Sequence, residues 1–245
     1  MTKLNVNTPR LISWQKFQPD DDAAGIANLA TPLRLRQIII AAIRAGDLSP
    51  GTRLKEIDLV EALAVSRTPL REALTALRAE GILERDDDGL RVRRLDWRDV
   101  RALYDLRGQL EGMAARLAAN NAFSAERAVI DEICRDESRL ISQSAPPNEL
   151  ARQNRRFHHA ILQAAGNRFL SESLERLSQL MVLLGATAYS LDGRADAIRD
   201  EHAAINVAIQ TGDAEGAETA MLTHLETALT ARLRLLSLTD DAEMD

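Results

Sequence analysis

Apolar residues recur every three or four positions through most of this chain, the spacing that places side chains on one face of a helix. The clearest stripe is short and consists of Leu70, Ala73, Leu74 and Leu77. Ser66 stands where an N-cap is expected, with a hydroxyl that can accept from first-turn amides, and Pro69 falls in the first turn, where a missing N–H costs little. Gly81 follows as a C-terminal stop. The pattern predicts one short helix between Ser66 and Gly81.

The segments around this helix complete a small domain. Two further helices are predicted upstream and a β-hairpin downstream. The helices cover residues 33–43 and 56–63, and the hairpin pairs 82–85 with 90–93 across the turn 86–89. Three helices and a hairpin in this order are typical of a winged helix-turn-helix, which we expect to cover residues 31–95.

From residue 98 onward only helical patterns occur. Six helices are expected, at residues 98–121, 124–142, 148–165, 168–188, 194–210 and 213–238. Their lengths and short links predict an antiparallel bundle. In the first of them Leu106 and Met113 share one apolar stripe with Leu103 and Leu110, as in a helix that packs on a core.

The fold class that follows is mainly α, with an N-terminal winged helix-turn-helix followed by an antiparallel all-helical bundle. The bundle is expected to occupy residues 96–240. Residues 1–30 lack periodicity and contain an acidic run, so we expect a mostly disordered arm. Trp14 and Phe17 are the residues of this arm that can pack on the folded body.

Charge is unevenly distributed along the 245 residues, whose net charge is −6. Residues 31–95 hold 12 Lys and Arg against 10 Asp and Glu, a net of +2, whereas residues 96–245 hold 16 against 24, a net of −8. The predicted winged helix is therefore the net-basic part. Its weak excess predicts modest sequence-independent affinity for nucleic acid and dependence on a dimer that docks two helices.

The sequence also indicates a compartment. Cys134 is the only cysteine and cannot form an internal disulfide, which fits a reducing cytoplasm. No apolar run approaches the roughly 20 residues of a membrane span, and the N-terminus lacks the hydrophobic region of a signal peptide. We expect a cytoplasmic protein without a membrane partner.

Basic and hydroxyl side chains cluster at the start of the short helix. Arg67, Thr68 and Arg71 lie around its N-terminal half, off the apolar stripe. Arginine can bond two acceptors on guanine or clamp a phosphate, so this helix fits a recognition helix in a DNA major groove. The alternative is an ordinary surface helix with solvated arginines.

The run VSRTPLREAL (65–74), preceded by the turn GDLSPG (46–51) and followed by EGIL (80–83), resembles the DNA-binding domain of the GntR family of bacterial transcription regulators. The resemblance implies that Arg67 and Arg71 reach bases while Ser66 and Thr68 hold phosphate. The wing departs from the family's usual basic or glycine-rich tip, because residues 86–88 are all aspartate. Like charge repels phosphate, so we expect the tip to contribute little.

Within that wing, Gly89 and Arg91 are the residues that we expect near the DNA backbone.

Histidines form the second group of interest. His158, His202 and His224 lie on three different predicted helices, and Asn154 shares a face with His158 because the two are four residues apart. Histidines on separate helices of a bundle can converge on a metal, and imidazole suits Zn²⁺ or Ni²⁺. The alternative is that these are ordinary hydrogen-bonded core histidines.

The segments NRRFHHAI (154–161), EHAAI (201–205) and THL (223–225) resemble motifs of the FCD ligand-binding domain, which accompanies the winged helix in the FadR branch of GntR regulators. Six helices look more like the VanR-type subgroup than the seven-helix FadR type. The resemblance implies an effector-binding and dimerisation domain whose metal ligands are Asn154, His158, His202 and His224. Many members carry aspartate at the first position, and a neutral amide is a poorer ligand. His159 points away from His158 and is expected to be a packing or surface residue.

The same resemblance implies a small organic acid as effector, held by the metal and by an arginine. Arg107 is the matching candidate, and the alternative is a salt bridge with Glu111 one turn later.

Together these features predict a homodimeric transcription regulator, typically a repressor, that binds a palindromic operator in double-stranded DNA. One alternative is an architectural DNA-binding protein with a purely structural metal site. The other is a metal-dependent hydrolase, but Glu201 is its only nearby candidate base and no nucleophile motif is present. We therefore do not expect an enzyme.

Overall fold

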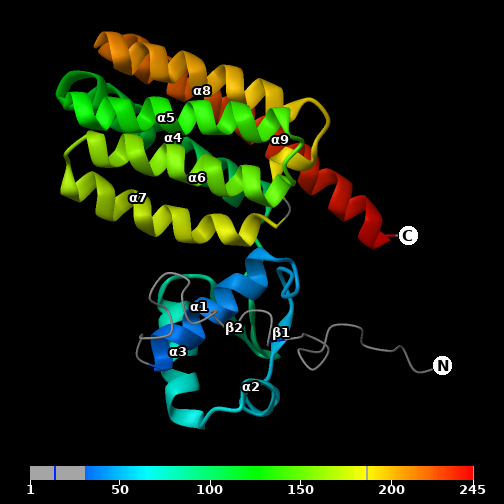
Figure 1. The fold of residues 1–245 in the computed structure, drawn as a ribbon. Coiled ribbons are helices and arrows are strands. Elements are labelled where there is room, and N and C mark those ends of the chain that lie inside the picture. Colours follow the sequence, from blue (N-terminus) through cyan, green and yellow to red (C-terminus); the bar gives the residue numbers. More distant parts are fainter. Residues whose placement is uncertain (1–13, 15–30, 186, 245) are drawn as a thin grey trace. The chain divides into compact units, whose positions relative to one another are not determined.

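The computed structural model describes Trp14 and residues 31–185 and 187–244, and in this part of the chain helices predominate (Figure 1). The chain forms two compact units, described separately here. Unit 1 contains the described residues up to Leu95 together with Ser178–Gly185, and unit 2 contains the remainder. The predicted arm lies outside the described residues except for Trp14, which is buried.

Unit 1 is a three-helix domain with a small antiparallel sheet. Its elements are α1 (Thr31–Arg44), β1 (Arg53–Leu54), α2 (Glu56–Leu63), α3 (Arg67–Ala79), β2 (Leu83–Asp86) and β3 (Gly89–Val92). The strand order is β1-β3-β2, so the predicted hairpin lies beside a two-residue strand that the sequence did not indicate. Helix α3 packs on α1 and α2 through the predicted stripe, which is buried in full.

Of the two capping features predicted for α3, the glycine stop at its C-terminus is present and the hydroxyl cap at its N-terminus is not. At the C-terminus Gly81 adopts φ +75°, and the amides of Gly81 and Ile82 bond back to the carbonyls of Arg78 and Leu77. This closure satisfies orphan carbonyls, as predicted for a glycine stop. At the N-terminus Ser66 has extended N-cap geometry, but its side chain makes no capping hydrogen bond. The expected hydroxyl cap is therefore wrong.

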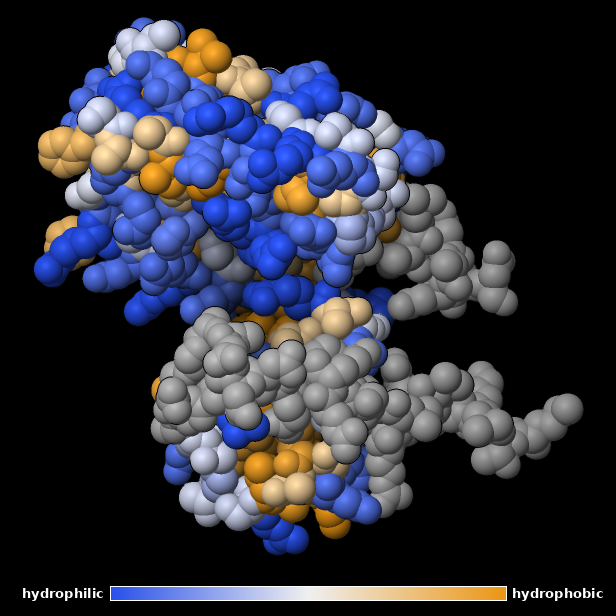
Figure 2. Space-filling view, in the orientation of Figure 1, coloured by the Kyte–Doolittle hydropathy of each residue, from blue (hydrophilic) through white to orange (hydrophobic). Residues whose placement is uncertain are grey.

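Unit 2 is a bundle of α-helices with short connections. Its elements are α4 (Trp97–Asn121), α5 (Ser124–Ser142), α6 (Pro147–Ala164), most of α7 (Arg168–Leu180), η5 (Ala188–Ser190), α8 (Arg194–Thr211) and α9 (Ala214–Met244). Helix α4 is central and packs against α6, α8 and α9. Asp96 caps α4, because its carboxylate accepts from the Asp99 amide at 2.8 Å. Polar side chains cover most of the face of this unit seen in Figure 2.

Two expectations about this unit are wrong. The helix expected at 168–188 ends at Leu180, and a 3₁₀ turn, η4 (Met181–Leu184), follows and packs on α1 within unit 1. On α4, Leu106 and Met113 are 48% and 47% exposed, whereas Leu103 is buried. The apolar stripe is thus wider than the face that α4 buries.

One charged side chain holds two helix ends together. The guanidinium of Arg127 on α5 donates to the carbonyls of Ala119 at 2.7 Å and Gln210 at 2.9 Å, and also to that of Ile209. These oxygens belong to the last turns of α4 and α8, which lack partners within their own helices. A cation there also complements the helix dipoles.

Arg127→Met is therefore expected to destabilise the protein by about 1–3 kcal/mol, since it removes the donor to the partly buried carbonyl of Ala119 while keeping an aliphatic chain. Urea denaturation followed by circular dichroism measures the change. Arg135→Met is the matched control, because this side chain is 71% exposed on the same helix. Equal losses in the two variants would contradict the capping role.

Candidate metal centre and DNA-binding surface

The structure brings the three predicted histidines together from α6, α8 and α9. One nitrogen from each of His158, His202 and His224 lies within 4.8 Å of the other two. The Nε2 atoms of His158 and His224 are 3.3 Å apart. His202 is fully buried, and its Nε2 has no hydrogen-bond partner among the described residues.

Each of these histidines has a carboxylate against its other ring nitrogen, Nδ1. The pairs are His158 with Glu111 at 2.5 Å, His202 with Glu137 at 2.7 Å and His224 with Glu201 at 2.6 Å. The carboxylates come from α4, α5 and α8, so five helices contribute to the cluster. A carboxylate in this position fixes the orientation and tautomer of a metal-binding imidazole.

Two of the carboxylates are kept ionised by arginines. Burial by itself would raise the pKa of Glu111, but Arg107 and the neighbouring histidine hold it below its usual range. Burial has the same tendency at Glu201, whose pKa is lowered by its histidine and by Arg194. An ionised carboxylate only accepts hydrogen bonds, so Nδ1 of His224, which is hydrogen-bonded to Glu201, carries the proton. The Nε2 lone pair of His224 then faces Nε2 of His158.

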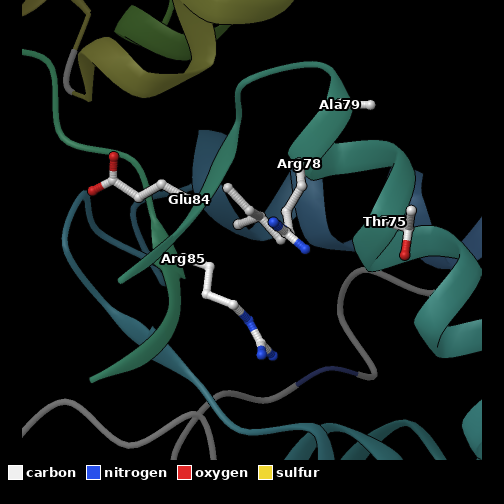
Figure 3. Close-up of a pocket in the computed structure, with 6 residues that line it drawn as sticks. Thr75, Arg78, Ala79, Glu84 and Arg85 are labelled. Carbon is white, nitrogen blue, oxygen red and sulfur yellow. The ribbon is translucent and has the colours of Figure 1, made fainter. Parts of the chain in front are cut away.

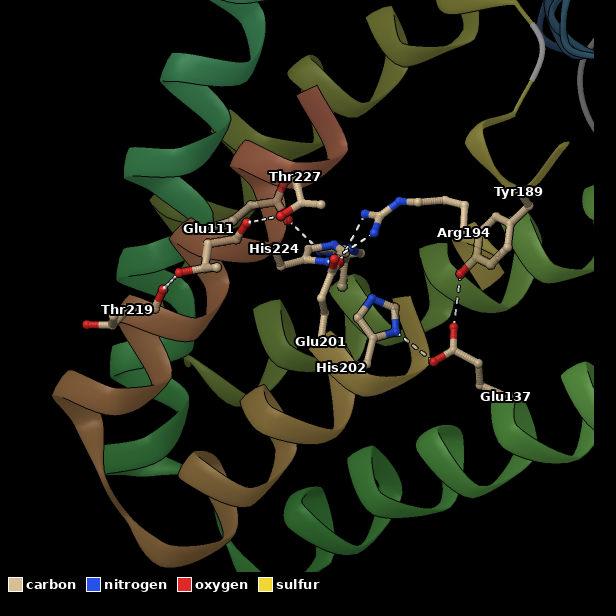
Figure 4. A network of polar contacts seen from close by, with 11 residues as sticks. Glu111, Glu137, Tyr189, Arg194, Glu201, His202, Thr219, His224 and Thr227 are labelled. Atoms are coloured by element: carbon tan, nitrogen blue, oxygen red, sulfur yellow. Dashed lines mark hydrogen bonds and ion pairs between the residues drawn. The ribbon is translucent and has the colours of Figure 1, made fainter. Parts of the chain in front are cut away.

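The third carboxylate has a different environment. Burial raises the pKa of Glu137, although the hydroxyl of Tyr189 donates to it at 3.0 Å. Figure 4 shows the resulting chain from Tyr189 through Glu137 to His202. Tyr189 lies on η5, so this short turn is tied to the centre of the bundle.

The electrostatics of the rings favour a cation at Nε2. Burial lowers the pKa of His202 well below its ordinary value and that of His224 to about 3, so both rings are neutral near pH 7. Two converging lone pairs repel unless a proton or metal lies between them. Nitrogens about 2.0–2.1 Å from a tetrahedral metal are about 3.4 Å apart, close to the observed 3.3 Å. The His158–His224 pair therefore has the spacing of a borderline divalent ion such as Zn²⁺, and the nitrogen of His202, within 4.8 Å of the other two, would have to move closer to bind the same ion.

The other residues predicted for this site lie around the cluster. Asn154 is half-buried on α6, one turn before His158, and its role as a ligand stays a prediction. Arg107 is buried, and its Nε lies 2.7 Å from Glu111. The salt bridge between Arg107 and Glu111, which was the alternative to an effector role, is thus formed, and it is buried. His159 is exposed.

The residues predicted to contact DNA lie on the open side of α3. Ser66, Arg67 and Thr68 are exposed at its N-terminal end. The Arg71 side chain is 63% exposed, and its Nε lies 2.8 Å from a carboxylate oxygen of Glu56 on α2. These four residues can therefore approach a groove together, after Arg71 exchanges its internal partner.

Gly89 and Arg91 lie at and beside the predicted hairpin turn, and their place near the DNA backbone stays a prediction. Gly89 adopts φ +121°, which favours glycine, at the turn between β2 and β3. Arg91 forms ion pairs with Glu84 at 2.9 Å and Asp86 at 2.5 Å, so it would have to exchange these partners to contact the DNA backbone.

A surface hollow of about 450 Å³ lies between α3 and β2 (Figure 3). The side chains of Arg78 and Arg85 point into it. The histidines lie on helices of unit 2, so this hollow is separate from the candidate metal centre.

Sequence reasoning missed several residues of the metal centre. Glu137, Tyr189 and Arg194 were not singled out, and Glu201 was considered only as a hydrolase base. Two signals were available. Glu201 directly precedes His202, so its side chain leaves the helix at another angle, toward His224. Arg194 lies seven residues before Glu201, two turns along the same face, and its two terminal nitrogens bond both carboxylate oxygens at 2.6 and 3.0 Å.

Comparisons with known proteins agree with both units. Residues 32–89 match the model of the bacterial regulatory proteins of the GntR family, and residues 102–227 match the FCD domain. The solved structure of Escherichia coli McbR/YncC is similar, with a TM-score of 0.73 and 22% identity over 85% of this chain and 99% of that one.

Two relatives extend through both domains. The uncharacterized HTH-type transcriptional regulator YdhC of Bacillus subtilis is 30% identical over 180 residues, which are 73% of this chain and 80% of the relative. The probable D-xylose utilization operon transcriptional repressor of Paenarthrobacter nicotinovorans is 32% identical over 199 residues, which are 81% of this chain and 87% of the relative. No described helix is long and apolar enough to cross a membrane.

The two domain matches and the two relatives show that the chain belongs to the GntR family of transcriptional regulators, with an N-terminal GntR DNA-binding domain and a C-terminal FCD domain, and is not an enzyme.

Proposed function

We propose that this regulator is a homodimeric repressor whose binding to a palindromic operator is controlled by a small carboxylate effector next to a divalent metal. The observation that carries the proposal is the set of three imidazoles, each with a carboxylate beside Nδ1 and with one nitrogen of each within 4.8 Å of the other two. Zn²⁺ or Ni²⁺ suits neutral imidazole ligands. The metal would be held by His158, His202 and His224, with Asn154 as the fourth ligand.

The effector would complete the metal's coordination through its own carboxylate. The neutral amide of Asn154 is the weakest of these four ligands, so an anionic ligand can displace it, or can add to the metal as a fifth ligand. Arg107 is the proposed second contact, since its guanidinium lies beside Glu111 and hence close to His158. Binding an acid there would require Arg107 to share its charge between Glu111 and the ligand.

The route by which the effector influences DNA binding is supported by the path of the chain. Ser178–Gly185 packs within unit 1, while the residues on either side of it belong to unit 2. Tyr189 follows four residues after Gly185 and is bonded through Glu137 to His202. A ligand that shifts this chain of contacts can favour one arrangement of the segment, provided that it binds one state better than the other.

Dimer formation through unit 2 is supported by the outward-facing part of the α4 stripe. Leu106 and Met113 are about half exposed, and the partly buried Leu110 and Leu117 lie between and beyond them in a heptad-like spacing. An exposed stripe of this kind is typical of helix–helix interfaces.

Leu106→Glu with Met113→Glu is therefore expected to shift the protein from dimer to monomer by at least about tenfold in dissociation constant, because charges would be buried in an apolar contact. Sedimentation equilibrium measures the shift. The exposed Val129 and Val207 provide a control pair of valine-to-glutamate changes. A dimer that survives the α4 changes would place the interface elsewhere.

The operator is the first thing to identify. The purified protein would be mixed with fragments of its source genome, and the retained fragments would be sequenced. Enrichment of a short inverted repeat upstream of one operon is the expected result. Retention without a shared sequence would favour the architectural alternative instead. We propose repression rather than activation because the relative from Paenarthrobacter nicotinovorans is a probable transcriptional repressor. Expression of a reporter gene placed behind the selected operator, with and without the protein, tests this.

A further inference from the structure

The basic side chains on the outer face of the wing are already paired with acids. Arg53 on β1 forms an ion pair with Asp88. Arg91 on β3 contacts Asp86 at 2.5 Å and Glu84 at 2.9 Å. The strand register places Arg53 opposite Arg91, and Arg91 opposite Glu84, so these side chains share one face of the sheet. The positive charge of this face is therefore neutralised within the wing.

The hairpin turn holds these acids in place. Asp86 pairs with Gly89 across the two-residue turn. The backbone amide of Asp88 donates to a carboxylate oxygen of Asp86 at 3.0 Å. Asp86 and Asp88 are thus part of the turn geometry, and each also contacts an arginine.

Other arginines of unit 1 remain available. Arg67 at the start of α3, and Arg78 and Arg85 at the hollow of Figure 3, form no ion pair with any residue that the structure describes. Arg85 directly precedes Asp86 on β2 and pairs with Leu90, so its side chain leaves the sheet on the face opposite that of Arg91. Arg71 on the same helix is paired with Glu56, so the recognition helix keeps Arg67 as an unpaired arginine at its N-terminal end, whereas Arg53 and Arg91 on the sheet face are both paired.

We propose that Asp86 and Asp88 act as built-in counterions that weaken sequence-independent DNA binding by this regulator. Such binding is driven by release of the cations condensed on DNA when arginines replace them. An arginine that already has a carboxylate partner gains little from a phosphate, because the carboxylate is then left unpaired beside the DNA. Operator occupancy would then depend on the recognition helices of a docked dimer. The proposal rests on DNA binding and requires neither the metal nor the effector.

The test uses the full-length protein with Asp86→Asn and Asp88→Asn together. Asparagine keeps an oxygen for the turn while removing the charge. Affinity for a fluorescent 30-base-pair duplex of random sequence would be measured by anisotropy over a range of KCl concentrations. Freeing one to two arginines should steepen the slope of log K against log[KCl] by about 0.9–1.8, and this raises affinity about 8- to 60-fold at 0.1 M salt.

Two further variants make the outcome decisive. Glu132→Gln with Asp192→Asn changes the net charge equally at exposed positions of unit 2, and should have little effect. Adding Arg53→Gln and Arg91→Gln to the wing variant should remove its gain. A gain no larger than that of the unit 2 control would overturn the proposal. A gain that persists without the two arginines would overturn the counterion role, because the aspartates would then act only by repelling phosphate.

Discussion

Replacing His202 with alanine is expected to lower the affinity for Zn²⁺ at least about 100-fold. Losing a ligand should cost more than losing a residue that orients one, which typically costs 10- to 100-fold. His202 is the most buried of the three histidines, and its Nε2 has no other partner among the described residues. Isothermal titration with Zn²⁺ measures the affinity directly.

Thermal stability gives a second measure of the same loss. Free Zn²⁺ at about 1,000 times its dissociation constant should stabilise the wild type by about 4 kcal/mol, and the variant by far less. Because alanine also leaves a cavity, the readout is the difference between melting with and without metal. His159→Ala is the matched control, since that side chain is exposed on the same helix as His158. Full metal occupancy in His202→Ala would place the site elsewhere.

Replacing Arg71 with alanine is expected to lower operator affinity by about 1–3 kcal/mol and to relax sequence preference at one position in each half-site. A bidentate arginine–guanine contact is worth this much discrimination. Arg71 lies on the exposed side of α3 near Arg67 and Thr68. A gel-shift series with single-base operator variants measures both effects.

The matched control is Arg78→Ala, which removes an exposed arginine from the C-terminal half of the same helix. It should leave sequence preference unchanged. If Arg71→Ala retained the wild-type preference across the series, its role in base reading would be wrong, and the ion pair with Glu56 would be its main function.

Elements with local signals were predictable from the sequence. The stripe of α3, its glycine stop and the β2–β3 turn depend on residues within a few positions of one another, so the pattern alone located them. Strand β1 has two residues, too few for a period to be visible. The run from Leu180 to Leu184 has the composition of a helix, but the positive φ of Gly185 and packing on α1 produce a 3₁₀ turn there.

Features that depend on packing between distant segments were not predictable. Periodicity marks Leu106 and Met113 as apolar but cannot distinguish a core from an interface. The histidines were located by their positions on three predicted helices and by motif resemblance, whereas Glu137 lies 65 residues from His202 in a helical segment without a motif. The contact of Glu137 with His202 forms only because α5 packs beside α8 in the folded protein.

The central claim is that the metal centre makes operator binding responsive to a small acid. The most direct measurement is operator affinity, by fluorescence anisotropy, of Zn²⁺-loaded wild type and of His202→Ala across a panel of small carboxylates. The account predicts that at least one acid changes the wild-type dissociation constant about tenfold or more and leaves that of the variant unchanged. Equal responses in the two proteins, or no response to any acid, would contradict it.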